Sequence, residues 1–283
     1  MKKVFQRLTI FFVGLPVLLS MVLFLPHYNH LFLNLLLIVF SALGAVELKN
    51  ILSQKNLIIS APEAAILGAI SPVAWTMVIS FDVTVRLVPC VFILGASWLL
   101  VSGIFTSSEK LDSFAGRTAA GFTVMIYPGL FISWVVKMAA LNEAGIVILT
   151  FFLIVLLNDS IAWLTGMLFG KGNRGIMAAS PNKSVAGFAG GLLASLLVGF
   201  TAAALIPGVF TSKLMPSIPA GILLGLLAGA AATLGDLCES AIKRSAGVKD
   251  SGSLVLGRGG ALDSMDSVAL AAPVYCIVYQ VLF

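Results

Sequence analysis

Long apolar runs alternate with short polar loops along the whole chain. An α-helix needs about 20 mainly apolar residues to cross the hydrocarbon core of a bilayer, and several runs approach or exceed that length. Pro72 and Pro128 interrupt two runs, which membrane helices tolerate because neighbouring helices can satisfy the freed backbone groups. The pattern predicts an all-α, polytopic membrane protein of about nine transmembrane helices, near residues 8–25, 31–46, 63–80, 84–105, 118–139, 145–168, 185–206, 217–235 and 262–283.

The basic residues indicate how these spans are oriented. If the amino terminus is cytosolic, fourteen of the seventeen Lys and Arg residues fall in cytosolic segments, and the other side keeps only Arg86, Lys137 and Lys213. Because cytosolic loops are enriched in Lys and Arg, we expect a cytosolic amino terminus and, after nine spans, a carboxyl terminus outside. No small-residue cleavage site follows the first apolar run, so we interpret it as a retained span and not as a signal peptide.

The composition agrees with a membrane protein and excludes several other classes. Hydrophobic residues make up 59% of the chain and charged residues 10%, whereas a soluble domain carries about a quarter charged residues. The net charge of +5 is spread among short loops, so it reports topology and does not indicate nucleic-acid binding. Three widely separated cysteines and two histidines in one loop argue against a zinc site or a disulfide scaffold.

Polar groups inside a bilayer are costly, which makes each of them a functional candidate. Residues 1–140 show only spans and loops, so we expect an N-terminal transmembrane scaffold there, whereas residues 141–283 hold the polar clusters and are the expected catalytic region. The run Asn158-Asp159-Ser160 interrupts the sixth span. It is either a polar cluster that bonds helix to helix or the wall of a site that is reached from the cytosol.

A loop rich in glycine and basic residues follows this span. It contains Lys171 and the run Ser180-Pro181-Asn182-Lys183-Ser184, and glycines 187, 190 and 191 begin the next span. Glycine lets backbone N–H groups approach an anion, a helix start favours negative charge, and Lys supplies a mobile counter-charge. The loop therefore suits a phosphate, although any cytosolic turn between spans would contain similar residues.

Acidic and basic residues are densest from residue 236 to residue 267. Asp236 and Glu239 share one helix face, and so do Asp263 and Asp266 at the mouth of the last span. If the two helix ends meet, their carboxylates make an oxygen-rich site for Mg²⁺, with nearby bases to clamp phosphates. The simpler interpretations are that Asp263 caps its helix, that Glu239 pairs with Lys243, and that the bases only determine topology.

In these residues the chain resembles the CDP-diacylglycerol synthases (phosphatidate cytidylyltransferases). The resemblance rests on an ordered pattern from about residue 158 to residue 273, made of Asn158-Asp159-Ser160, Phe169-Gly170-Lys171, Ser180-Pro181-Asn182-Lys183-Ser184, Gly235-Asp236-x-x-Glu239-Ser240, Lys243-Arg244, Lys249-Asp250-Ser251 and Gly259-Gly260-x-Leu262-Asp263-x-x-Asp266-Ser267. Arg258 and Ser264 depart from the pattern, because the family usually has His and Arg at these positions. A divergent or inactive homologue therefore stays open as an alternative.

The resemblance implies an enzyme, a nucleotidyltransferase that transfers the cytidylyl group of CTP to phosphatidate and yields CDP-diacylglycerol and pyrophosphate in phospholipid biosynthesis. It implies Asp236, Asp263 and Asp266 as catalytic residues and Mg²⁺ ligands, with Lys249 and Asp250 also catalytic, and it leaves a second metal ion open. The implied substrate-binding residues are Asp159, Ser160, Lys171, Ser180, Lys183, Ser184, Glu239, Ser240, Lys243, Arg244, Arg258, Gly259 and Gly260.

The implied partners are CTP, phosphatidate and the bilayer, with no nucleic acid, and a homodimer stays open. The expected location is the cell (inner) membrane, with the active site facing the cytoplasm. Two other classes of membrane protein fit the sequence less well. A CDP-alcohol phosphatidyltransferase fits poorly, because Asp266 is followed by Ser267 and an apolar span. A transporter that uses the same polar cluster would need a polar path through the bilayer, and few ionisable groups lie near the middle of the spans.

Overall fold

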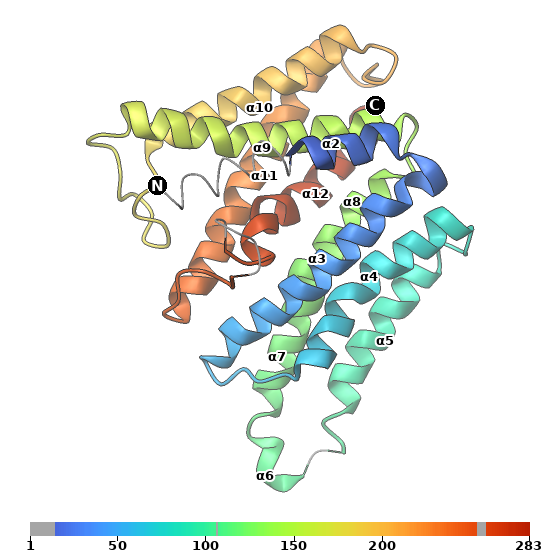
Figure 1. Cartoon of the computed structure of the whole chain (residues 1–283), viewed down its shortest axis with the longest axis vertical. Helices are drawn as coiled ribbons and strands as arrows, with labels where there is room; N and C mark the ends of the chain where they lie inside the picture. The colour runs from blue at the N-terminus through green and yellow to red at the C-terminus, as the bar shows by residue number, and fades with distance from the viewer. Residues whose placement is uncertain (1–14, 106, 254–258) are drawn as a thin grey trace. The chain divides into compact units, whose positions relative to one another are not determined.

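The structure is a computed structural model that describes residues 15–105, 107–253 and 259–283 (Figure 1). Its regular elements in these ranges are helices, with one isolated β-bridge between Arg174 and Ser184 and no strand. The predicted all-α class is therefore confirmed for the described residues. The helices group into two compact units, which are described separately below.

Unit 1 takes the chain up to Ala140 together with Ser245–Met265. Helix α4 is central to its packing, because α4 contacts α3, α5, α7 and α8. A π-helical segment, η2, joins α7 to α8 around Pro128, where the missing backbone N–H disturbs the regular hydrogen bonding. The elements are α2 (Leu15–Phe24), α3 (His27–Ser53), α4 (Ala61–Phe81), α5 (Leu87–Val101), α6 (Ser108–Leu111), α7 (Phe114–Val124), η2 (Met125–Phe131) and α8 (Ile132–Met138).

Unit 2 takes Leu141–Arg244 and Asp266–Phe283. It contains α9 (Ala144–Phe169), α10 (Val185–Leu205), α11 (Ser217–Ser245) and most of α12 (Leu262–Leu282), whose first residues belong to unit 1. Helices α9 and α10 run side by side in Figure 1 and are in extensive contact.

Within the described residues, seven helices are long and apolar enough to cross a membrane, by length and composition. They coincide with seven of the predicted spans: α3, α4, the continuous segment Phe114–Met138, α9, α10, α11 and α12. Helix α5, at the predicted span 84–105, is apolar but only 15 residues long, and the predicted first span begins in residues outside the described ranges. The chain is thus a multi-pass helical membrane protein, while nine spans and the orientation of the termini stay predictions.

Small residues allow α10 and α11 to approach each other closely in unit 2. A Cβ atom built on Gly199 would lie 2.0 Å from the Gly221 carbonyl oxygen, and one on Gly225 would lie 2.2 Å from the Ser195 carbonyl oxygen. Gly187 and Gly191, near the start of α10, meet the backbone of α9 in the same way. Close backbone contact through small residues is a common way for membrane helices to associate.

We expect Gly225→Ala to destabilise unit 2, because its Cβ atom would overlap backbone that cannot move without separating α10 from α11. Overpacking of this kind typically costs about 1–3 kcal/mol. Thermal unfolding of the purified protein in detergent measures the effect. Gly208→Ala is the matched control, since nothing lies within 4 Å of a Cβ atom at Gly208; equal unfolding temperatures for the two variants would contradict the close crossing.

Candidate functional site

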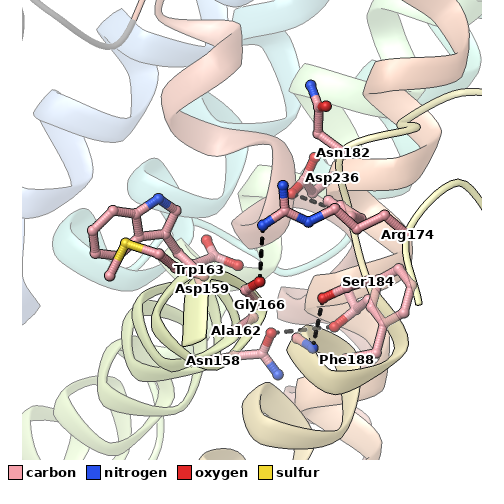
Figure 2. Close-up of a pocket in the computed structure, with 14 residues that line it drawn as sticks. Asn158, Asp159, Ala162, Trp163, Gly166, Arg174, Asn182, Ser184, Phe188 and Asp236 are labelled. Atoms are coloured by element: carbon pink, nitrogen blue, oxygen red, sulfur yellow. Dashed lines mark hydrogen bonds and ion pairs between the residues drawn. The ribbon is translucent and has the colours of Figure 1, made fainter. Parts of the chain in front are cut away.

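A cavity of about 420 Å³ opens in unit 2 among α9, α10, α11 and the loop that joins α9 to α10 (Figure 2). Its wall combines carboxylates, basic side chains and amides with two aromatic rings. It is lined by Asn158, Asp159, Ala162, Trp163, Gly166, Met167, Arg174, Asn182, Lys183, Ser184, Gly187, Phe188, Thr233 and Asp236. Four of the predicted site residues thus meet around one cavity: Asp159, Lys183, Ser184 and Asp236.

Asn158 anchors the inner wall of the cavity. Its side-chain nitrogen donates to the Ser195 hydroxyl at 2.9 Å and to the Gly229 carbonyl at 3.2 Å, and its amide oxygen accepts from Thr233 at 3.2 Å. The residue is 1% exposed. A buried amide with these partners ties α9 to α10 and α11, as the first interpretation of the run 158–160 proposed.

Asp159, the next residue along α9, lies on the cavity wall. Its carboxylate accepts from the Ser267 hydroxyl at 3.0 and 3.2 Å, which joins α9 to α12 within unit 2. Asn158 and Asp159 therefore both bond helix to helix and both line the cavity, while the interpretation of this run as the wall of a site that is reached from the cytosol stays a prediction. Ser160 is half-buried and does not line the cavity.

The loop between α9 and α10 closes one side of the cavity. Arg174 donates to the Gly166 carbonyl at 3.0 Å, and Figure 2 shows its guanidinium group over that carbonyl. Arg174 also pairs with Ser184 through the β-bridge. Ser184 caps α10 by accepting from the Gly187 amide at 3.0 Å, which favours a helix start at Val185.

Lys183 and Asp236 form an ion pair across this cavity, with 2.5 Å between Nζ and Oδ2. Both side chains are about a quarter exposed, so water and ligands can reach them. The other oxygen of Asp236 accepts from Ser240 at 3.4 Å, one turn further along α11. A cation and a carboxylate that share an accessible cavity can bind an anion and a metal ion respectively.

Four carboxylates of unit 2 lie near one another, and one of them belongs to the Lys183–Asp236 pair. The negative charges of Asp159, Asp236 and Glu239 all act on the Asp266 carboxyl group. A Cβ atom on Gly235 would lie 2.4 Å from the Asp266 carbonyl oxygen, so α11 and α12 touch at this level. These carboxylates come from three helices of unit 2, α9, α11 and α12, while the acidic site that also includes Asp263 stays a prediction.

Glu239 is fully buried and pairs with Lys243 at 2.5 Å, one turn along α11. The simpler interpretation of this pair is confirmed, and the predicted phosphate contact of Lys243 would require that pair to rearrange. Arg244, Lys249 and Asp250 are exposed.

The second acidic position, Asp263, lies in unit 1 at the start of α12. Its Oδ2 accepts from the Ser251 amide at 2.9 Å, from the Ser251 hydroxyl at 2.8 Å and from the Gly260 amide at 2.8 Å. The side chain thus reaches back into the preceding loop. Asp236 belongs to unit 2, so a metal site shared by the two aspartates stays a prediction.

The remaining predicted residues lie elsewhere. Lys171 is exposed and Ser180 is half-buried, and neither lines the cavity. Arg258 lies outside the described residues. Ser264, which stands where the family usually has Arg, donates to the Gly260 carbonyl at 3.1 Å.

Several cavity residues were missed by the sequence analysis. Trp163 lies four residues after Asp159 and Thr233 three residues before Asp236, so helical spacing from the predicted acids could have found both. Phe188 lies one turn after Ser184 and could have been found in the same way. Glu47 of α3, which lies in unit 1 and accepts from the amides of Ala261 and Leu262, had no such signal, because it lies in the half of the chain that we expected to be only a scaffold.

The carboxylates near the cavity fit a hard divalent cation whose other coordination positions are filled by a nucleotide. In the ranges that the structure describes, no three His, Cys, Asp or Glu side chains form a group that could hold a metal ion by themselves. Mg²⁺ usually takes only one or two protein carboxylates and leaves its other positions to water and phosphate. Asp236, with Asp159 and Asp266 nearby, meets that requirement.

Comparisons with known proteins agree with the resemblance in the motifs. A phosphatidate cytidylyltransferase of Thermotoga maritima is 31% identical over 222 residues, which are 77% of this chain and 77% of that protein. One of Staphylococcus saprophyticus is 34% identical over 186 residues, 66% of this chain and 67% of that protein. An uncharacterized Escherichia coli protein, YnbB, is 32% identical over 157 residues, 55% of this chain, and the match spans half of that relative's length. The model of the cytidylyltransferase family matches residues 5–282, and the chain therefore belongs to that family.

Proposed function

We propose that this chain transfers the cytidylyl group of CTP to phosphatidate and releases pyrophosphate. Membership of the cytidylyltransferase family makes it a nucleotidyltransferase, and relatives that it matches over two thirds of their length or more are named phosphatidate cytidylyltransferases. The observation that carries the proposal is the Lys183–Asp236 pair in an open cavity, since it lies within the part of the chain that matches the family pattern. The product is CDP-diacylglycerol.

The basic residues supply the binding groups for the phosphates. Lys183 and Arg174 both line the cavity, beside the start of α10. Cationic side chains and a helix start favour phosphate oxygens. Lys243, Arg244 and Lys249 follow on α11 and the loop after it, where a lipid phosphate at the membrane surface would approach.

The carboxylates supply the ligands for Mg²⁺. We assign Asp236 and Asp266 of unit 2 to the metal, and also Asp263 of unit 1, as the family resemblance implies; a second metal ion would also have to draw on these carboxylates. Bound Mg²⁺ would neutralise charge on the phosphates of CTP and on the departing pyrophosphate. If Asp236 held the metal, Lys183 would be free to bind a phosphate oxygen.

The reaction needs no strong general base. A phosphate monoester carries a charge of about −1.5 to −2 at pH 7, so phosphatidate already presents an anionic oxygen. That oxygen attacks the α-phosphorus of CTP, a new P–O bond forms, and the bond from the α-phosphorus to the oxygen that bridges to the β-phosphorus breaks. The residues therefore act by holding the two anions in line and by offsetting their repulsion.

We place the reaction at the cytoplasmic face of the cell (inner) membrane. CTP is soluble and phosphatidate is a lipid, so the site has to face both water and the bilayer surface. The excess of basic residues on the predicted cytosolic side supports this orientation. The partners are thus CTP, phosphatidate and the bilayer, and a homodimer stays open as the assembly.

We expect Asp236→Asn to lower kcat/KM for CDP-diacylglycerol formation by roughly 10²-fold or more, because the variant loses the charge that binds the metal. Transfer of label from CTP to lipid by the purified protein, with phosphatidate and Mg²⁺ present, measures the effect. Asp82→Asn is the matched control, since Asp82 is an exposed residue at the end of α4. Full activity of the Asp236 variant would remove this carboxylate from the site.

We expect Lys183→Met to raise the KM for CTP by roughly tenfold while the unfolding temperature changes little. A partly exposed ion pair contributes only about 0–1 kcal/mol to stability, whereas a lysine that contacts phosphate contributes directly to substrate affinity. Steady-state kinetics with varied CTP tests this, with the exposed loop variant Lys55→Met as control. An unchanged KM would show that Lys183 does not bind the nucleotide.

A further inference from the structure

Helix α3 of unit 1 carries a single acidic side chain, Glu47, which the proposed mechanism does not use. It lies near the end of an apolar span, where an ionised carboxylate is costly unless donors surround it. The hydrogen-bond donors around Glu47 therefore indicate its role.

The donors come from the loop that precedes α12. The amide of Ala261 donates to Oε1 of Glu47 at 3.0 Å, and the amide of Leu262 donates to Oε2 at 2.8 Å. The Ser251 hydroxyl lies 3.1 Å from the same Oε2. Glu47 thus fixes the backbone of two residues that directly precede Asp263.

Asp263 is held by the other donors of the same loop. The Ser251 hydroxyl lies 2.8 Å from Asp263 Oδ2 and 3.1 Å from Glu47 Oε2, so a single hydroxyl proton is shared between two carboxylates. The Gly260 amide also donates to Asp263. The position of the Asp263 carboxylate is therefore coupled to Glu47 through one side chain and one short backbone segment.

The glycines of this loop show how closely the groups are packed. A Cβ atom on Gly260 would lie 2.2 Å from Glu47 Oε2 and 2.2 Å from the Ser251 hydroxyl. Gly259 has a φ of +113°, and a Cβ atom there would lie 2.3 Å from Asp263 Oδ2. The glycine pair leaves room for the two carboxylates, and the conformation of Gly259 is one that favours glycine.

We propose that Glu47 is a positioning residue, which orients Asp263 for metal binding by holding Ser251 and the amides of Ala261 and Leu262. The inference rests on the proposed function in so far as Asp263 is a metal ligand. A purely structural role of Glu47 would not affect the affinity of the protein for a divalent cation, whereas this positioning role does. In this role Glu47 contacts neither substrate nor metal.

The test uses the purified full-length chain in detergent and the variant Glu47→Gln. Gln keeps the length of the side chain but replaces one acceptor oxygen with an NH₂ group, which faces N–H donors and cannot bond to them. Binding of Mn²⁺, followed by electron paramagnetic resonance, reports the metal site without any turnover. Hydrogen exchange of peptides that cover residues 251–265 reports the loop.

We expect the dissociation constant for Mn²⁺ to rise roughly tenfold in Glu47→Gln, in the same direction as in Asp263→Asn, and the loop amides to exchange faster. In the transfer assay the Mg²⁺ concentration for half-maximal rate should rise and kcat should fall, while the KM for phosphatidate stays constant. The control is Glu63→Gln, which removes a carboxylate of unit 1 that pairs with Arg117. This control should leave Mn²⁺ binding unchanged.

Unchanged Mn²⁺ binding in Glu47→Gln would overturn the inference, and so would a loss of activity matched only by a loss of thermal stability. If Glu47→Gln does not fold, Gly260→Ala tests the same contacts, with Gly208→Ala as control, and unchanged Mn²⁺ binding in Gly260→Ala would likewise overturn it. If the wild-type protein makes no CDP-diacylglycerol, the proposed function fails, whereas Mn²⁺ binding and hydrogen exchange still decide the role of Glu47.

Discussion

An ionised carboxylate beside a bilayer has to be satisfied by donors from the protein, and this constraint organises the polar part of both compact units. In unit 2 two carboxylates have lysine partners, because Asp236 pairs with Lys183 and Glu239 pairs with Lys243. In unit 1 Asp263 is held by a hydroxyl and by backbone amides. The same electrostatic problem is thus solved in two ways, with different consequences for binding.

A lysine side chain that pairs with a carboxylate can be replaced by another cation, whereas a backbone amide cannot leave the carboxylate unless its loop moves. The Lys183 side chain is flexible and partly exposed, so a cation that arrives at Asp236 can replace it, and the lysine remains close enough to meet a phosphate. The Gly260 and Ser251 amides are fixed by the backbone, and Glu47 holds the adjoining residues. The Asp236 carboxylate can therefore change its partner, whereas the Asp263 carboxylate is preorganised by its own loop.

The sequence was informative where one physical requirement acts on contiguous residues. Span length and apolar composition identified seven helices, and helical spacing placed Glu239 beside Lys243. It was uninformative where partners come from distant segments. The bonds from Asn158 to Ser195 and Gly229, and the contact of Glu47 with a loop more than 200 residues later, depend on tertiary packing that no local pattern encodes. For the same reason, the sequence alone could not show that four of the predicted site residues line one cavity: Asp159, Lys183, Ser184 and Asp236.

The glycines show why a family pattern is not a map of ligand contacts. The sequence suggests that the glycines at the start of α10 let backbone amides approach an anion. In the structure, Gly187 and Gly191 pack against the backbone of α9, and the Gly187 amide donates to the Ser184 hydroxyl that caps the helix. Gly260 has its amide bonded to Asp263 and its open side filled by Glu47. In each case the missing Cβ atom serves packing around functional groups. A substitution there would act through helix spacing or carboxylate orientation, so a loss of activity at a glycine of this pattern is first evidence about geometry and only then about substrate.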